Sequence, residues 1–231
     1  MLTLKQHAYQ WIRTKLVSGD MPAGCRLSDD ALAKEIGISR SPVREAISQL
    51  ASEGLVECRP RCGAFVKVPS REELEELYEV RIALESFAAG KAAMFAGDDE
   101  IAELERLHQE LLATVNACRR RPGKVADRAL TDRFLAGDMK FHLQILRAGG
   151  NKRLCSLVDD CRIFIQVFGH VPIEHDARLM EDSAQQHASI LAAIHRRDSQ
   201  AARDLTMSHI AMAGKLVLDK YQGNAPSLAR A

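Results

Sequence analysis

Ser39-Arg40-Ser41-Pro42-Val43-Arg44 is the stretch that decides the fold of the N-terminal part of this chain. Proline lacks a backbone N–H and therefore fits the first turn of a helix, where that amide has no partner in any case. We expect a helix that has Ser41 as its cap, Pro42 in its first turn and Gly54 at its end. Its apolar residues recur at helical spacing and predict one buried face: Val43, Ile47, Leu50 and Ala51.

The opposite face of this helix carries groups suited to binding DNA. Arg44 and Ser48 are four residues apart and project together. An arginine can donate to O6 and N7 of guanine or bind a phosphate. Serine hydroxyls, such as those of Ser39 and Ser41, and the free N–H groups of a helix start can bind phosphate oxygens. In a lone helix such arginines are as easily solvated surface charges, so the neighbouring segments decide between the two interpretations.

The segments around this helix predict a winged helix-turn-helix. We expect two helices before it, near residues 4–18 and 28–36, and two strands after it, near 55–59 and 64–68. A tight turn at Arg61-Cys62-Gly63 joins the two strands and places a basic residue on the wing. The basic helix start lies between a preceding helix and turn and a following two-stranded ribbon. This arrangement favours a DNA-binding helix over one whose arginines are only solvated surface charges.

These residues, with Glu53-Gly54-Leu55-Val56 and Gly63-Ala64-Phe65-Val66, resemble the N-terminal domain of the GntR family of bacterial transcription regulators. The resemblance implies DNA contacts from the helix start and from the wing, at Ser39, Arg40, Ser41, Arg44, Arg61 and Gly63. Asp29-Asp30 is a departure, because some members have a DNA-contacting arginine early in the second helix. No DNA contact is therefore expected there.

The rest of the chain, from residue 70 to residue 221, has helical periodicity throughout. We expect six helices, near residues 70–95, 98–120, 124–148, 151–169, 179–196 and 199–221. Three of their apolar faces contain polar residues: Asp138 and His142 on one helix, His187 on another and His209 on the last. An unpaired buried carboxylate costs several kcal/mol, and a shared metal ion removes that cost.

One carboxylate and three imidazoles suit a divalent ion, with Zn favoured and Ni or Mn as alternatives. Each histidine taken alone is more often a satisfied core residue, and Asp138 can also pair with a single histidine. Arg81 lies on the apolar face of its own helix and needs a carboxylate partner. That partner is either Glu85, one turn further on, or a bound acidic ligand.

The C-terminal region resembles the helical effector domain of FadR-type GntR regulators, called the FCD domain. The resemblance rests on motifs that follow one another along the chain: Val80-Arg81-x-x-Leu84-Glu85, Asp138-x-x-x-His142, Gly150-Asn151-x-x-Leu154, His187 and His209-Ile210. It implies a metal bound by Asp138, His142, His187 and His209. It also implies a small organic acid held near the metal, with Arg81 and, more weakly, Asn151 as effector contacts.

Composition is that of an ordinary globular protein, with 46% apolar and 27% charged residues among 231. The basic excess lies at the N-terminal end: residues 1–70 hold ten Lys and Arg against seven Asp and Glu, and the remainder holds 22 against 24. The sequence has no apolar run of about 18 residues and no signal-peptide core, so we expect a cytoplasmic protein without membrane contact. None of the six cysteines forms a Cys-x-x-Cys pair; free thiols are expected, with a redox role for Cys58 and Cys62 as the alternative.

The sequence thus predicts a mainly α protein. A winged helix-turn-helix over residues 1–69 precedes an all-helical, effector-binding bundle over 70–222 and a disordered tail over 223–231. We expect a homodimeric, ligand-responsive repressor that binds double-stranded operator DNA, a divalent metal and a small carboxylate effector. Two alternatives are a DNA-binding regulator with a purely structural metal and a metal-dependent hydrolase. No general base beside the cluster supports the hydrolase, so we expect no enzymatic activity.

Overall fold

The computed structural model describes residues 2–168 and 175–221, without the side chains of residues 159–163, 165, 166 and 168. The chain forms two compact units. Among the described residues, the first comprises 2–73, 160–168 and 221, and the second comprises 74–159 and 175–220. The predicted tail at 223–231 and His170 lie outside the described residues.

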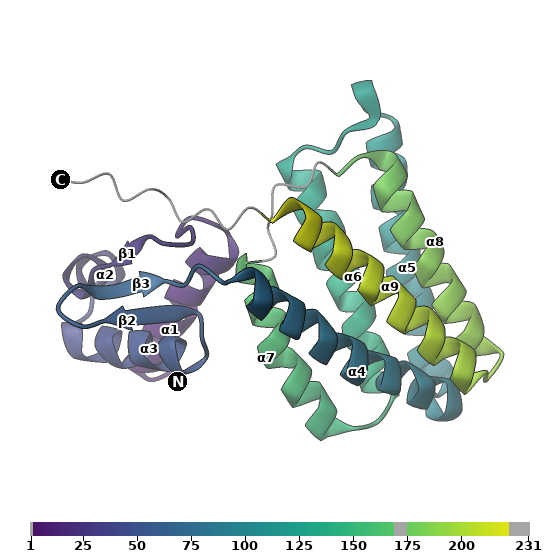
Figure 1. The fold of residues 1–231 in the computed structure, drawn as a ribbon, viewed down its shortest axis with the longest axis horizontal. Coiled ribbons are helices and arrows are strands. Elements are labelled where there is room, and N and C mark those ends of the chain that lie inside the picture. The colour runs from purple at the N-terminus through teal and green to yellow at the C-terminus, as the bar shows by residue number, and fades with distance from the viewer. Residues whose placement is uncertain (1, 169–174, 222–231) are drawn as a thin grey trace. The chain divides into compact units, whose positions relative to one another are not determined.

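The N-terminal part has the predicted winged helix-turn-helix (Figure 1). Its elements are α1 Leu4–Val17, β1 Arg26–Leu27, α2 Asp29–Ile36, α3 Arg40–Ser52, β2 Val56–Arg59 and β3 Gly63–Val66. The apolar face predicted for α3 packs into the core of this unit, where Val43 and Leu50 have no exposed surface. Gly37 ends α2 in a left-handed conformation, with φ of 78°, that a side chain would strain.

Two details of the prediction are wrong. The sheet has three strands in the order β1-β3-β2, all antiparallel, because the two-residue β1 pairs Arg26 with Phe65. Two residues are too short for an alternation to be visible in sequence. The cap of α3 is Ser39 rather than Ser41, and the helix begins at Arg40. Pro42 still lies in the first turn, since none of the first four amides of a helix has an intrahelical partner.

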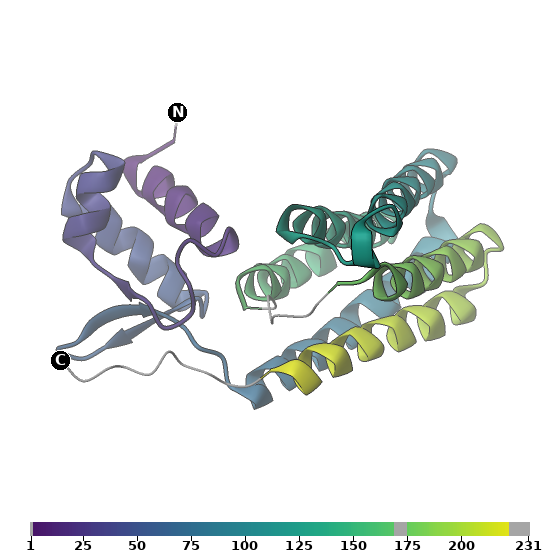
Figure 2. The same ribbon diagram turned by 90° about the horizontal axis from the view of Figure 1, so that it is seen from above.

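The C-terminal part is all helical, as predicted (Figure 2). Its helices are α4 Arg71–Phe95, α5 Asp98–Arg119, α6 Arg128–Ala148, α7 Lys152–Phe168, α8 Ala177–His195 and α9 Ser199–Lys220, with a 3-10 turn at Pro122–Lys124. The helix expected from residue 124 begins only at Arg128, because the Asp127 side chain accepts a hydrogen bond from the Leu130 amide and caps it there. No described helix is long and apolar enough to span a membrane.

Helices α4 and α9 lie side by side and approach closely through glycine (Figures 1 and 2). A Cβ atom at Gly214 of α9 would lie 2.8 Å from ring atoms of Tyr78 on α4. One placed at Gly90 of α4 would lie 2.3 Å from Nε of Arg203 on α9. These close contacts constrain how the two helices pack.

The cysteines for which the structure describes a side chain are free thiols. Cys58 and Cys62 are exposed on the wing, whereas Cys118 is buried. Burial raises the pKa of the Cys118 thiol and keeps it protonated near neutral pH.

Candidate functional site

The structure brings together the four residues predicted to bind a metal. Asp138 and His142 lie one turn apart on α6, His187 lies on α8 and His209 on α9. One ligand atom from each lies within 4.8 Å of the others. The three histidines are buried, and the Asp138 side chain keeps 27% of its surface exposed. The cluster therefore has a closed, apolar side and one side within reach of solvent.

The imidazoles converge through their Nε2 atoms. His209 Nε2 lies 3.1 Å from Nε2 of His142 and 3.1 Å from Nε2 of His187. Asp138 Oδ1 lies 3.3 Å from His187 Nε2. Two nitrogen ligands on a tetrahedral zinc ion are about 3.3 Å apart when each bond is about 2.0–2.1 Å long. The spacing of the donor atoms therefore fits a small divalent cation.

The other ring nitrogen faces a hydrogen-bond acceptor in two of the histidines. His142 Nδ1 lies 2.9 Å from Oε2 of Glu85, and His209 Nδ1 lies 2.6 Å from Oε1 of Gln186. Gln186 Oε1 is placed to accept from Nδ1 of His209, which leaves a lone pair on Nε2 of that ring. The contact between Glu85 and His142 has ion-pair distance without hydrogen-bond geometry. The lone pair on Nε2 of His209 lies 3.1 Å from Nε2 of both His142 and His187. One lone pair can accept only one of these contacts well, whereas a cation can bind all three nitrogens.

Burial also keeps two of these histidines neutral. It holds the pKa of His187 well below its ordinary value, and neighbouring His142 and His108 add to the effect. Burial likewise lowers the pKa of His209, with His187 and His142 as further causes. The ring of Phe141 stacks on His187 with 4.4 Å between centroids. Neutral imidazoles with free lone pairs are the form in which histidine binds metals.

Arg81 has the partner that the sequence offered, because its Nε donates to Oε1 of Glu85 at 2.7 Å. Both side chains are buried, at 11% and 2% exposure. Burial alone would raise the pKa of Glu85, but the Arg81 guanidinium and His142 outweigh it and hold that pKa well below its usual range. Glu85 is therefore an anion shared by the arginine and a histidine of the cluster.

Sequence reasoning missed this second role of Glu85. The available signal was its position, four residues after Arg81 and on the buried face of α4. Gln186, which precedes His187, was also missed and had no signal in the sequence. Asn151, predicted as a weak effector contact, caps α7: its Oδ1 accepts from the backbone amides of Arg153 and Leu154, each at 3.2 Å.

The predicted DNA-binding residues lie at the start of α3 and on the wing. Arg40 and Arg44 are well exposed, at 59% and 66% of their side-chain surface. Arg61 stands at the tip of the β2–β3 turn in a left-handed conformation with φ of 63°, which is unusual for a residue with a side chain. Gly63, with φ of 104°, begins β3.

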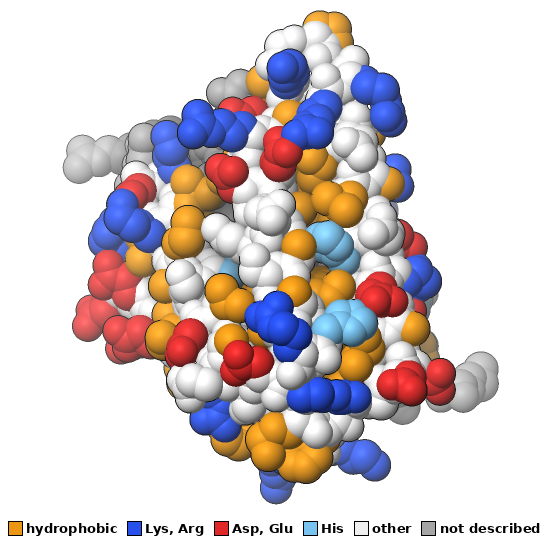
Figure 3. All heavy atoms as spheres, turned by 90° about the vertical axis from the view of Figure 1, so that its right-hand side faces the viewer, with side chains coloured by type: hydrophobic (Ala, Val, Ile, Leu, Met, Phe, Trp, Pro, Cys, Tyr) orange, Lys and Arg blue, Asp and Glu red, His pale blue; other side chains and the backbone are white. Residues whose placement is uncertain are grey.

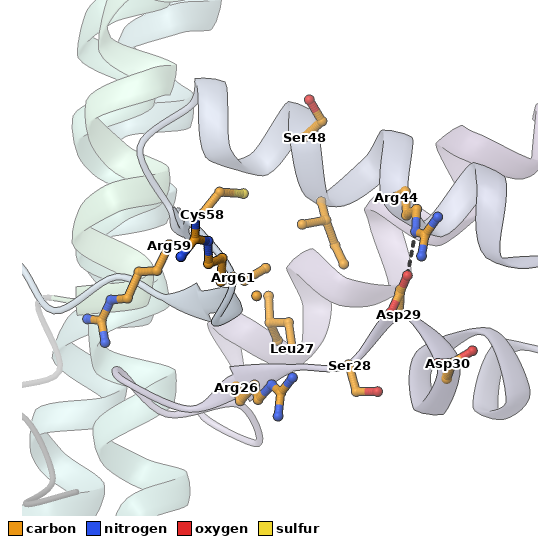
Figure 4. A pocket seen from close by; sticks show the side chains of 13 residues that line it. Arg26, Leu27, Ser28, Asp29, Asp30, Arg44, Ser48, Cys58, Arg59 and Arg61 are labelled. Carbon is orange, nitrogen blue, oxygen red and sulfur yellow. Dashed lines mark hydrogen bonds and ion pairs between the residues drawn. The ribbon is translucent and has the colours of Figure 1, made fainter.

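A pocket of about 510 Å³ lies between the start of α2, α3 and the wing (Figure 4). Four arginines line it: Arg26, Arg44, Arg59 and Arg61. The sequence did not single out Arg26 or Arg59, since Arg26 comes from the two-residue strand and Arg59 from the end of β2. By contrast, the molecular face in Figure 3 mixes positive, negative and apolar side chains without a dominant basic area. The pocket of the winged helix, where the four arginines lie beside Asp29 and Asp30, therefore concentrates positive charge that suits a polyanion.

A winged helix with arginines at its recognition-helix start, followed by a helical bundle, defines a DNA-binding transcription regulator. The chain belongs to the GntR family of bacterial regulatory proteins with an FCD domain. The family described as "Bacterial regulatory proteins, gntR family" matches residues 4–66, and "FCD domain" matches residues 76–212.

Relatives and solved structures agree with this assignment. The chain is 24% identical to "HTH-type transcriptional repressor RspR" of Escherichia coli (strain K12), over 96% of this chain and 92% of that protein. It is 28% identical to the "Gluconate operon transcriptional repressor" of Bacillus licheniformis, over 74% of this chain and 64% of that protein. The solved structure "E. coli McbR/YncC" has the same fold, with a TM-score of 0.76, 20% identity, and coverage of 96% of this chain and 100% of that one.

Proposed function

We propose that this regulator is a ligand-responsive repressor whose helical domain binds a divalent metal and a small organic acid. The observation that best supports the metal is the convergence of the donor atoms: Nε2 of His209 lies 3.1 Å from Nε2 of both His142 and His187, and Oδ1 of Asp138 lies 3.3 Å from Nε2 of His187. A single cation at this point of convergence would be bound by all four residues. Both relatives described above are named as repressors, which supports the direction of regulation.

In this proposal Asp138, His142, His187 and His209 hold the metal, with Zn favoured over Ni or Mn. Glu85 and Gln186 orient two of the imidazoles, as acceptors around metal-binding histidines generally do. When bound, the metal supplies a Lewis-acidic position for an oxygen ligand. The exposed side of Asp138 is the side from which such a ligand would arrive.

The effector is proposed to be a carboxylate that reaches the metal and Arg81, with Asn151 as a weaker contact. Arg81 keeps its charge, because Glu85 raises its pKa despite burial. A carboxylate effector therefore shares this guanidinium with Glu85. One relative is named for a gluconate operon, and gluconate is a hydroxy acid whose oxygens suit such a site.

The proposed response to the effector requires two winged-helix domains, called heads below, on one operator. We propose a homodimer, in which each α3 enters a major groove through Ser39, Arg40, Ser41 and Arg44. Each wing contacts the DNA backbone or the minor groove through Arg61 and Gly63. The effector regulates only if it binds one arrangement of the two heads more tightly than the other.

Calorimetry on chelator-treated protein tests the metal. Titration with Zn²⁺ should give one tight site per chain, and His187→Ala and His209→Ala should lose it. His195→Ala is the matched control, since His195 lies on α8 as His187 does but is exposed and pairs with Glu105 at 2.7 Å. Loss of binding in that control, or retained binding in the other two variants, would contradict the assigned ligands.

Titration with a panel of organic acids, including gluconate, tests the effector. Binding of an acid should need the metal and should weaken in Arg81→Gln. Heat of binding with metal but not with chelator supports the proposal, and a change in DNA affinity under the same conditions supports regulation. No binding by any acid, with the metal present, would favour the alternative of a purely structural metal.

A further inference from the structure

Arg44, a residue proposed to contact DNA, is held by an acidic residue of the preceding helix. Its Nε donates to Oδ2 of Asp29 at 2.5 Å, and the two side chains point toward each other at one side of the arginine-lined pocket (Figure 4). Asp29 is the first residue of α2. The acidic residue therefore has a described partner on the recognition helix.

The geometry of the guanidinium gives this ion pair a consequence for DNA recognition. A guanidinium donates from Nε and from two terminal nitrogens, Nη1 and Nη2, in one plane. The described contact of Asp29 is with the Nε edge, so the end carrying Nη1 and Nη2 faces away from it. That end is a fork that can donate to both O6 and N7 of one guanine.

Asp29 itself is well fixed. Ser28 caps α2, with its Oγ accepting a hydrogen bond from the Ala31 amide at 3.3 Å, and the Asp29 side chain is 27% exposed. The carboxylate is thus anchored on a helix start, while Arg44 is 66% exposed and has a long flexible stem. Asp29 therefore determines where the side chain of Arg44 lies.

We infer that Asp29 is a positioning residue for base recognition. It holds Arg44 so that the terminal nitrogens of the guanidinium can donate to guanine, and it keeps this guanidinium from binding phosphates. Asp29 neutralises the charge of Arg44 and adds a carboxylate that the phosphate backbone repels. The pair therefore adds little to sequence-independent attraction, which comes from unpaired cations that displace counterions. The inference rests on the proposed contact of Arg44 with DNA.

Asp30 provides a matched control. It is the next residue of α2 and also pairs with an arginine of α3, Arg40, at 2.8 Å. This pair differs in two respects: Asp30 binds a terminal nitrogen, Nη1, and both side chains are more than half exposed. Asp30→Asn therefore removes the same charge from the same helix without freeing the Nε edge of Arg44.

The test is selection of bound duplexes from a random-sequence DNA library, with the full-length chain as wild type, Asp29→Asn, Asp29→Ala, Asp30→Asn and Arg44→Ala. In both Asp29 variants, preference for guanine at one position of the selected site should fall about tenfold. Their affinity for random duplex should rise, with a salt dependence steeper by about 0.9 in logarithmic slope, as for one added phosphate contact. Asp30→Asn should keep the guanine preference.

Three results would overturn the inference. Unchanged base preference in the Asp29 variants would leave that residue only a charge or helix-start role, which a melting curve would reveal separately. Equal loss of guanine preference in Asp30→Asn would make the effect one of net charge. If Arg44→Ala changes neither affinity nor preference, the proposed DNA contact of Arg44 fails as well, and this outcome is distinct from the first two.

Discussion

Replacing Glu85 by glutamine should destabilise the helical domain, because it leaves Arg81 as a buried cation without its anion. The side chains of Glu85 and Arg81 are only 2% and 11% exposed, and Oε1 of Glu85 lies 2.7 Å from Nε of Arg81. Removing one partner of a buried ion pair costs about 3–5 kcal/mol. Glutamine keeps one acceptor oxygen for Arg81, so we expect the lower end, about 3 kcal/mol. For a domain of this size that lowers the melting temperature by about 6–12 °C.

The assay is thermal unfolding followed by circular dichroism in the presence of a chelator, which separates loss of the ion pair from loss of a metal. Glu103→Gln is the control: Glu103 also pairs with an arginine at 2.7 Å, but on the surface, where such pairs contribute little. It should melt as the wild type does. The double variant Arg81→Leu/Glu85→Leu should recover much of the loss, because no unpaired charge remains.

A Glu85→Gln protein that melts within a degree of the wild type in chelator would refute the reasoning. It would mean that the Arg81 charge is solvated or paired in some other way. A large loss in Glu103→Gln would also refute it, since burial would then not be the cause.

Three further outcomes follow from the same structure. In chelator, the difference in free energy of unfolding between wild type and Glu85→Gln should be largest above the unfolded glutamate pKa of about 4.3. It should shrink as pH falls below that value, because the folded-state pKa of Glu85 is lowered. Urea titrations in which the difference grows in acid would contradict this. Gly214→Ala should lose about 1–3 kcal/mol in urea titrations by forcing Tyr78 away, and equal stability would disprove that close contact. Arg61→Gly should relieve about 1 kcal/mol of left-handed strain and yet weaken DNA binding in gel-shift titrations; unchanged DNA affinity would count against the wing contact.

Much of the fold could be predicted because hydrophobic periodicity survives in a sequence. Each helix from α4 to α9 matches an expected segment, with ends that differ by a few residues. Strand β1 could not be predicted, since two residues carry no period and its pairing with β3 depends on tertiary contacts. The cap of α3 was misplaced because proline is tolerated at more than one position in a first turn.

The convergence of Asp138, His142, His187 and His209 could be predicted because each interrupts an apolar face that must point inward. The contacts of Glu85 with His142 and of Asp29 with Arg44 could not. Each joins two helices, and which polar side chains meet depends on how those helices pack. The position of Glu85 on a buried face was a signal for a buried partner, but Arg81 already met it, so His142 was not indicated as a second partner.

The sharing of Glu85 between Arg81 and His142 has an evolutionary consequence. Replacing any one of the three leaves a buried charge or a misoriented imidazole behind, so single substitutions pass through a weakened protein. Natural selection should therefore keep or exchange the three as a group. Related FCD domains that have lost the histidines are expected to have changed the positions of Arg81 and Glu85 as well, and covariation among these three alignment columns would be the signature.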